Sequence, residues 1–179
     1  MCLGEAMGGE EERRYTKAEL LERMAATRRV VEAAIAGKDE ATLTRPGLDG
    51  WSVKDHLAHL TVWQRSLMAL LEGRSRPAAM GIDDLTQEEE SGFEEINEVL
   101  RERVKDQPLD RVLAEFRQSR ADLLTVLDRL SDEDLYKPYS HFQPNDPPYN
   151  PDPVIGWIVG NTFGHEEEHL EWFEGLLRG

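Results

Sequence analysis

The chain has 179 residues, with 21 lysines and arginines against 36 aspartates and glutamates and a formal net charge of −15. This length suits one domain that buries a core without disulfide bonds, while the acidic balance would repel nucleic acid phosphates and anionic membrane surfaces, so we expect neither as a partner. The single cysteine, Cys2, and the absence of an apolar segment long enough for a membrane span or a signal peptide predict a cytoplasmic protein.

The first helix is predicted from about residue 17 to Gly37. Residues 1–14 are rich in glycine and glutamate without periodicity, which is typical of a disordered leader. Thr16 and Glu19 have the spacing of a capping box, in which hydroxyl and carboxylate satisfy each other's backbone amides. Helically spaced apolar residues follow, so we place a single domain over residues 15–179.

The second helix is predicted over about residues 52–72. Ser52 and Asp55 form another capping box behind a segment rich in glycine and proline. An acidic stretch over residues 88–105 then carries apolar residues at positions 93, 96, 99 and 100, a pattern that favours an additional short helix at the edge of the fold.

Two further helices complete the predicted bundle. Residues 109–130 have a strong amphipathic pattern, closed by a capped turn at Ser131. Residues 137–153 contain six of the nine prolines, from which we expect a long loop without regular structure, and the last helix should run from about 153 to 177. Because no segment alternates like a strand, we predict an all-α fold, a four-helix bundle with a short helix between its second and third helices and a long proline-rich loop before the last.

The segment GHEEEHLEW, residues 164–172, matches the H-E-x-x-H spacing of zinc metalloproteases. Extended proteases of this type require glycine three residues and histidine six residues after the second histidine, but Trp172 and Gly175 occupy those positions. Only ten residues follow His169, and none is histidine or aspartate. We therefore reject the protease interpretation.

The two histidines of this segment still form half of a metal site. His165 and His169 are four residues apart, so both imidazoles project from one helix face. A third ligand must come from upstream, where His56 and His59 lie one turn apart on the second helix and His141 lies in the proline-rich loop. In a bundle an inward histidine on one helix can complete a site begun on another. The spacing alone does not choose between His56 and His59.

Several neighbours are candidates for lining or supporting this site. Trp63 and Trp172 share stripes with the histidines and could form its walls, although tryptophans are more often core residues. We expect Glu166 and Glu168 on solvated helix flanks, from which one of them could orient an imidazole. Tyr139 and His141 are candidates for substrate contact if the proline-rich loop is a lid.

The segments DGWSVKDHLAHLTVWQ and GWIVGNTFGHEEEHLEWF together resemble the DinB-like superfamily of bacterial four-helix metalloenzymes, which includes the damage-inducible and YfiT-like proteins. In that family a Trp-Ser or Trp-Thr pair opens the second helix, a histidine follows the tryptophan by eight positions, and two histidines four residues apart lie on the last helix. Counted from Trp51, position eight is His59. The resemblance thus implies His59, His165 and His169 as metal ligands and leaves His56 to line the pocket or orient His59.

The sequence of these two segments is most similar to the subgroup related to the colibactin self-resistance protein. The resemblance implies a divalent ion, zinc or nickel, that activates water or a low-molecular-weight thiol such as bacillithiol or mycothiol against a small electrophilic substrate, as in a transferase or hydrolase. It also makes a homodimer plausible. The alternative function is that of a binding or sequestration protein whose bundle cavity holds a hydrophobic metabolite without catalysis.

Overall fold

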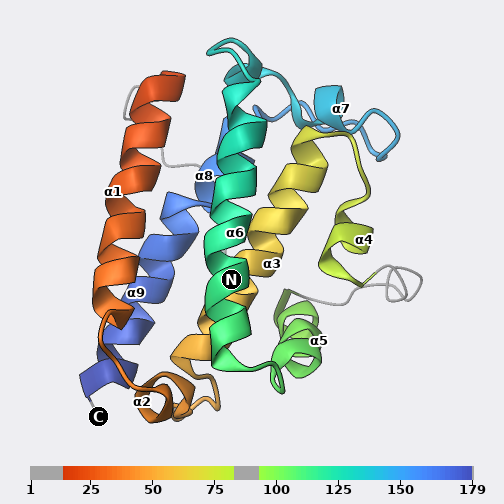
Figure 1. The fold of residues 1–179 in the computed structure, drawn as a ribbon. Helices are drawn as coiled ribbons and strands as arrows, with labels where there is room; N and C mark the ends of the chain where they lie inside the picture. The colour runs from red at the N-terminus through yellow and green to blue at the C-terminus, as the bar shows by residue number, and fades with distance from the viewer. Residues whose placement is uncertain (1–13, 83–92, 179) are drawn as a thin grey trace.

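The structure is a computed structural model that describes residues 14–82 and 93–178. Four long helices lie side by side (Figure 1): α1 (Lys17–Ile35), α3 (Val53–Leu71), α6 (Leu109–Asp128) and α9 (Phe163–Arg178). α1 and α9 run in one direction, and α3 and α6 run in the other. Within the described ranges there is no strand, only an isolated bridge between Pro138 and Pro153. The predicted all-α four-helix bundle is confirmed.

Shorter helices connect the four. They are α2 (Glu40–Thr44), α4 (Arg76–Met80), α5 (Phe93–Val104), the 3-10 turn η1 (Asp134–Tyr136), α7 (Tyr139–Phe142) and α8 (Ile155–Gly160). α4 and α5 return the chain to the start of α6, which is why α3 and α6 are parallel (Figure 1). α5 is the expected additional helix, whereas residues 1–13 of the predicted leader, with Cys2, and residues 83–92 fall outside the described residues. None of the described helices is both long and apolar enough to cross a membrane.

Both predicted capping boxes are present. The backbone amide of Thr16 donates to the Glu19 carboxylate at 2.9 Å, and the Glu19 amide donates back to the Thr16 hydroxyl at 3.2 Å. At the start of α3 the Ser52 amide and hydroxyl donate to the Asp55 carboxylate at 2.9 and 2.6 Å. These contacts satisfy amides that have no partner within the helix, so each cap defines where its helix begins.

The last helix differs from the prediction, because it is broken between α8 and α9. In a continuous helix the amide of Thr162 would bond to the carbonyl of Ile158. Instead the Thr162 hydroxyl donates a hydrogen bond to that carbonyl at 2.6 Å, and the Thr162 amide donates to the carbonyl of Val159 at 3.1 Å. A side chain that competes with the backbone for a carbonyl is a recognised cause of such breaks.

The proline-rich segment also differs from the prediction, because it contains the one-turn helix α7. Its two ends pair with each other: the amide of Tyr139 donates to the carbonyl of Asp152 at 2.8 Å, and the amide of Val154 donates to that of Lys137 at 2.9 Å. Both donors follow a proline in the chain, so the prolines do not interrupt this pairing. The expectation of a segment without regular structure is therefore wrong.

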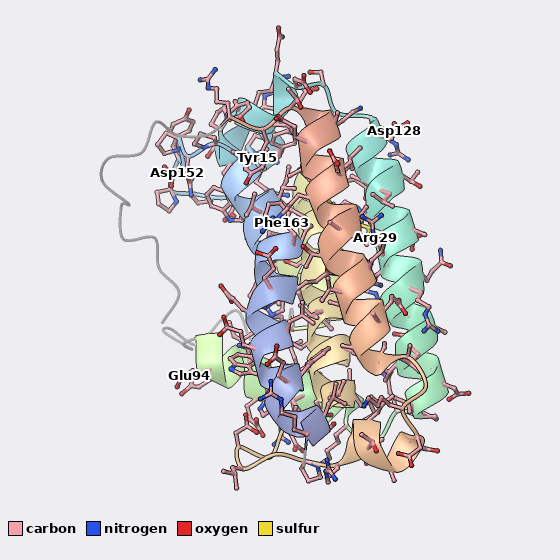
Figure 2. The ribbon with its side chains drawn as sticks, turned by 90° about the vertical axis from the view of Figure 1, so that its left-hand side faces the viewer. Tyr15, Arg29, Glu94, Asp128, Asp152 and Phe163 are labelled. Carbon is pink, nitrogen blue, oxygen red and sulfur yellow. The ribbon has the colours of Figure 1, made fainter. Side chains whose placement is uncertain are left out.

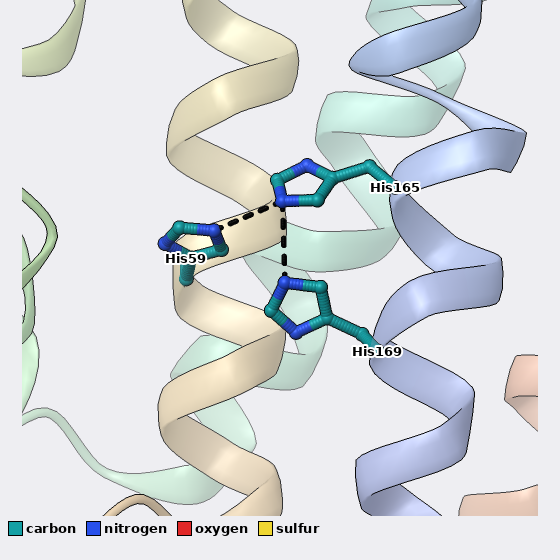
Figure 3. Close-up of side chains that lie close together, drawn as sticks. All are labelled: His59, His165 and His169. Atoms are coloured by element: carbon teal, nitrogen blue, oxygen red, sulfur yellow. Dashed lines mark hydrogen bonds between the residues drawn. The ribbon is translucent and has the colours of Figure 1, made fainter. Parts of the chain in front are cut away.

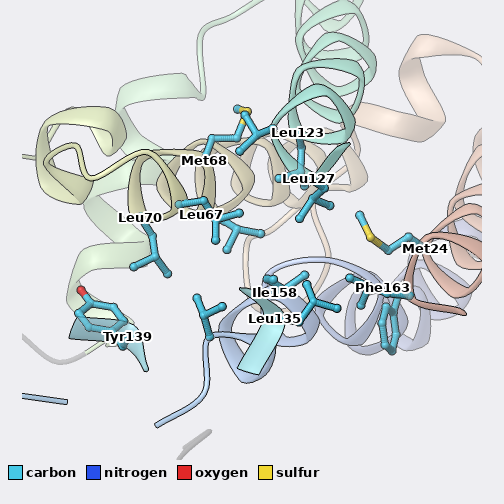
Figure 4. Packing of buried hydrophobic residues seen from close by; sticks show 14 residues of the cluster. Met24, Leu67, Met68, Leu70, Leu123, Leu127, Leu135, Tyr139, Ile158 and Phe163 are labelled. Atoms are coloured by element: carbon cyan, nitrogen blue, oxygen red, sulfur yellow. The ribbon is translucent and has the colours of Figure 1, made fainter. Parts of the chain in front are cut away.

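The buried apolar side chains form two principal clusters, one at each end of the bundle. The α7-end cluster includes Leu67 of α3, Leu123 of α6 and Tyr139 of α7, which lies beside Leu70 (Figure 4). The α2-end cluster includes Leu57 of α3, Phe116 of α6 and Leu43 of α2. All four long helices contribute to both clusters. Viewed from the side, α1 lies over the seam between α9 and α6 (Figure 2).

Candidate metal centre

Three of the five histidines converge between α3 and α9 (Figure 3). Nε2 of His165 lies 3.0 Å from Nε2 of His59 and 3.2 Å from Nε2 of His169. His59 and His169 are buried, and His165 is half-buried. The Ser52 cap sets where α3 begins, and His59 follows two turns later on the side of that helix that faces α9. These three residues could together hold a metal ion.

The arrangement of nitrogen atoms fits a cation. A neutral imidazole nitrogen can either donate one hydrogen or offer one lone pair, so Nε2 of His165 cannot form a full hydrogen bond with both neighbours at once. A tetrahedral ion with metal–nitrogen distances near 2.05 Å would separate its ligand nitrogens by about 3.3 Å, which is close to the observed 3.0 and 3.2 Å. Nδ1 of His59 and of His165 has no hydrogen-bond partner among the described residues.

Burial keeps these imidazoles in the neutral form that a metal ligand requires. Desolvation, reinforced by the neighbouring imidazoles, lowers the pKa of His59 to about 2 and the pKa of His165 to about 4. The same two causes lower the pKa of His169 strongly. Near neutral pH all three rings therefore offer lone pairs without first losing a proton.

His56 lies against His169, whereas the resemblance implied that it lines the pocket or orients His59. The two Nδ1 atoms are 3.0 Å apart, and the His56 ring is 2 % exposed. Burial lowers the pKa of His56 to about 4, so a neutral His56 can accept a hydrogen bond from His169. Such a contact orients a ligand ring and selects its tautomer.

Three indoles surround the histidines. Trp63 lies against His59 and His165, with ring centroids 6.0 and 6.3 Å apart, and donates from Nε1 to the side chain of Asn97 at 3.3 Å. Trp172 lies 4.8 Å from His169 and remains 53 % exposed.

The third indole was missed by the sequence analysis. Trp51 lies 5.2 Å from His56 and 5.7 Å from His59, measured between ring centroids. Its position beside the capped start of α3 is the signal that could have placed it at the site.

The expectation for Glu166 is wrong, because this residue is not on a solvated flank. Its side chain is 0 % exposed and accepts hydrogen bonds from Arg28 at 3.0 Å and Gln64 at 3.3 Å. Burial raises the pKa of Glu166, opposed by the charges of Arg120 and Arg28. Glu168 is exposed, as expected. The contacts described for Glu166 are with these polar groups, and none is with an imidazole.

The structure does not bring Tyr139 and His141 to the histidines. Tyr139 is buried in the α7-end cluster, packs against Trp157 at 4.9 Å and donates its hydroxyl to Asp146 at 2.7 Å. Leu70 of the same cluster is about three turns of α3 away from His59. His141 is exposed and lies against Phe142.

Solved structures with the same fold cover nearly the whole chain. The colibactin self-resistance protein ClbS, crystallised in complex with double-stranded DNA, superposes with a TM-score of 0.68 at 17% identity, over 92% of this chain and 96% of its own. A protein from Streptococcus pneumoniae gives 0.67 at 16% identity, over 93% and 91% of the two chains. An uncharacterised protein from Escherichia coli UTI89 gives 0.68 at 16% identity, over 91% and 93%.

The first of these structures overturns one expectation. We expected no nucleic acid partner because the net charge is −15, but a protein with this fold has been crystallised with double-stranded DNA. The exclusion is therefore wrong as an inference from charge. Net charge averages over the whole surface, whereas a contact with phosphates depends on the groups at one patch.

The family follows from the sequence itself. No curated protein matches the chain. The family model described as the DinB superfamily matches residues 23–173, a range that extends from α1 into α9 and includes all three converging histidines. The chain belongs to the DinB superfamily.

Proposed function

We propose that this protein is a divalent-metal-dependent enzyme in which His59, His165 and His169 hold the ion. The observation that carries the proposal is the convergence of three Nε2 atoms whose mutual contacts cannot all be satisfied by hydrogen bonds. Three protein ligands leave at least one coordination position open, as in catalytic sites. Neutral nitrogen donors suit zinc or nickel.

The proposed reaction is the attack of water or a low-molecular-weight thiol on a small electrophilic molecule. An ion bound at this site would lower the pKa of a coordinated water to about 7 or stabilise the thiolate form of a bound thiol. The family resemblance suggests bacillithiol and mycothiol as candidate thiols. Trp51, Trp63 and Trp172 provide apolar walls beside the ligand nitrogens. A neutral His56 can accept a hydrogen bond from Nδ1 of His169 and so orient its ring.

The sequestration alternative receives less support from the cavities. A groove of about 330 Å³ near the C-terminal end of α3 is lined largely by charged and polar side chains, among them Glu72, Asp122 and Arg129. A second cavity, of about 10 Å³, is too small for a metabolite. Neither has a histidine in its lining, so neither links the interior of the bundle to the candidate metal centre.

Metal content tests the proposal directly. The protein is purified beside His59→Ala and His169→Ala variants, with His141→Ala as the matched control because His141 is exposed on α7. We expect about one zinc or nickel ion per chain in the wild type and the control, and loss of that ion in both site variants with the helical circular dichroism retained. A wild type without metal after incubation with either ion contradicts the proposal.

Turnover is the second arm. The metal-loaded protein is incubated with a small epoxide or maleyl electrophile, with and without bacillithiol or mycothiol. Product that depends on both the metal and His59 supports the enzyme. Stoichiometric binding of the electrophile by the His59→Ala variant without product favours sequestration.

Duplex DNA is a second candidate ligand, favoured by the ClbS complex alone. Fluorescence anisotropy with a labelled duplex at low and at physiological salt tests it, because binding through phosphates weakens steeply as salt rises. Saturable binding that survives physiological salt supports this candidate. No change in anisotropy at low salt rejects it.

A further inference from the structure

A layer of buried polar residues crosses the bundle between its two apolar clusters. On each long helix the layer lies between members of the two clusters. On α3, for example, Leu60 of the α2-end cluster precedes it and Leu67 of the α7-end cluster follows it. Every member is at most 9 % exposed. The polar layer consists of Arg28 on α1, Gln64 on α3, Ser119 and Arg120 on α6, and Glu166 on α9.

Glu166 is the residue at which the four helices meet. Its Oε1 accepts from Arg28 Nη1 at 3.0 Å and from Gln64 Nε2 at 3.3 Å, and its Oε2 lies 3.8 Å from Arg120 Nη2. Gln64 in turn accepts from the Ser119 hydroxyl at 3.0 Å. One carboxylate on α9 is therefore held by side chains from α1, α3 and α6.

Two further contacts join the helices through their backbones. Arg28 Nη2 donates to the carbonyl of Phe116 on α6 at 2.6 Å, and Arg120 Nη2 donates to the carbonyl of Met24 on α1. A guanidinium group that binds both a carbonyl and a carboxylate in fixed directions tolerates little sliding between the helices that it joins.

The polar layer is not optimised for stability. Two buried guanidinium groups share the buried carboxylate of Glu166, although Arg28 also pairs with Glu32 at 3.6 Å. Arg120 Nη1 and Glu166 Oε2 have no hydrogen-bond partner among the described residues. A buried network that is incompletely paired is less stabilising than apolar side chains of similar volume. What such a layer can provide is a single arrangement of the helices, since apolar side chains tolerate alternative registers that directed polar contacts do not.

The position of Glu166 connects this arrangement to the metal centre. Glu166 directly follows His165 and precedes His169 by three residues, so the rotation of α9 that seats its carboxylate also directs both imidazoles toward His59. A shift of α9 by one residue would turn its side chains by about 100° and remove the imidazoles from the site. We propose that the polar layer positions His165 and His169 by fixing the register and rotation of α9 against the other three helices.

The decisive experiment separates positioning from stability, and its affinity arm rests on the proposed function. The combined variant Arg28→Met, Gln64→Leu, Arg120→Met and Glu166→Leu replaces every charge of the polar layer, and the amide that donates to Glu166, by apolar side chains of similar volume. The Ser119 hydroxyl keeps the carbonyl of Phe116 as its acceptor. The single variant Glu166→Gln keeps the volume of the side chain but removes its charge, which takes the counter-charge from Arg120 while Arg28 keeps Glu32 at 3.6 Å. Leu123→Ala, in the α7-end cluster, is the control for lost stability, and Glu174→Gln is the control for an exposed glutamate on α9.

We expect the combined variant to unfold at the same denaturant concentration as the wild type or a higher one, yet to bind zinc about 10-fold or more weakly. Its cobalt-loaded form should have an altered visible spectrum. Leu123→Ala should unfold at a lower concentration with wild-type zinc affinity and spectrum. If the combined variant keeps both the affinity and the spectrum of the wild type, the proposal is overturned.

Nitrogen-15 NMR of the metal-free imidazoles keeps this test independent of the proposed function. We expect distinct Nδ1 and Nε2 shifts for His169 in the wild type, and shifts that move toward tautomer averaging in the combined variant. If the wild type binds no metal, the proposed function fails and this comparison alone decides: unchanged shifts overturn the positioning role. If the combined variant does not fold, the zinc affinity and the nitrogen-15 shifts of Glu166→Gln decide in the same way.

Discussion

Nδ1 of His56 lies 3.0 Å from Nδ1 of His169, and this contact links a buried imidazole outside the candidate metal site to one inside it. If His169 presents an unprotonated Nε2 to an ion, its proton must be on Nδ1, from which it donates to His56. His56 then carries its own proton on Nε2. A metal ligand oriented by a second imidazole keeps its acceptor only while that imidazole is neutral.

Replacement of His56 should weaken metal binding without removing a ligand. His56→Phe keeps the ring that packs between Trp51 and Trp172 but removes the acceptor, and we expect zinc affinity to fall about 10-fold. His56→Asn, which restores an acceptor oxygen, should recover part of the loss. Competition with a chromophoric chelator measures both affinities, and equal affinities in His56→Phe and the wild type would show that the contact does not support the site.

The helices and two ligands of the candidate site could be predicted because local chemistry determines them. The Thr16 and Ser52 capping boxes define where α1 and α3 begin, and apolar periodicity gives their inward faces. A spacing of four residues places His165 and His169 on one face of any α-helix. The choice of His59 over His56 required the family resemblance, because both residues point inward and only the packing of α9 against α3 distinguishes them.

The polar layer could not be predicted in the same way. Glu166, Glu167 and Glu168 read as a charged run, and a buried glutamate is rare enough that exposure is the better expectation. Its burial depends on Arg28 and Arg120, each far away in the sequence. One signal was available: Glu166 lies four residues after Thr162 and seven before Phe173, both buried, so it occupies an inward position of α9.

Metal should stabilise the fold if the three histidines hold it. An ion that binds only the folded state raises the free energy of unfolding by about 4 kcal/mol at a free concentration 1,000 times its dissociation constant. We therefore expect zinc to raise the melting temperature of the chelator-treated protein. His165→Ala should remove most of the increase, and the exposed-site variant His141→Ala should keep it. An equal increase in all three proteins would assign the effect to nonspecific sites.

The metal-free protein should lose stability as the pH falls from about 6.5 to about 5. In this range the folded state keeps His56, His59, His165 and His169 neutral, since burial lowers the pKa of each. The unfolded chain protonates them near pH 6.5. Because the unfolded state then binds more protons than the folded state, the free energy of unfolding decreases as the pH decreases. The decrease is up to about 1.4 kcal/mol per pH unit for each histidine.

Urea unfolding at several pH values in the presence of chelator measures this slope. The carboxyl groups whose pKa is lowered in the fold, such as that of Glu115, act nearer pH 4, below this window. Glu166, whose pKa is raised by burial, acts in the opposite direction, and it does so equally in the wild type and in a histidine variant. His169→Asn should reduce the slope by one histidine's share, which is about 0.7 kcal/mol per pH unit at pH 6.5 and approaches about 1.4 kcal/mol per pH unit near pH 5. A slope identical to that of the wild type would mean that His169 is protonated in the folded protein as readily as in the unfolded chain.

Two glycines of α9 should respond to alanine in opposite directions. A Cβ atom on Gly164 would lie 3.0 Å from the carbonyl oxygen of Val159 and 3.4 Å from its Cγ1, where α9 begins close to the end of α8. Backbone cannot move away as a flexible side chain can, so Gly164→Ala should lower the free energy of unfolding by about 1–3 kcal/mol. The same substitution at Gly175 meets nothing within 4 Å and should raise it by about 0.5–1 kcal/mol, because alanine favours the helix. Denaturant unfolding of the two variants gives the comparison. If Gly164→Ala is as stable as Gly175→Ala, the start of α9 does not lie as close to the end of α8 as the structure has it.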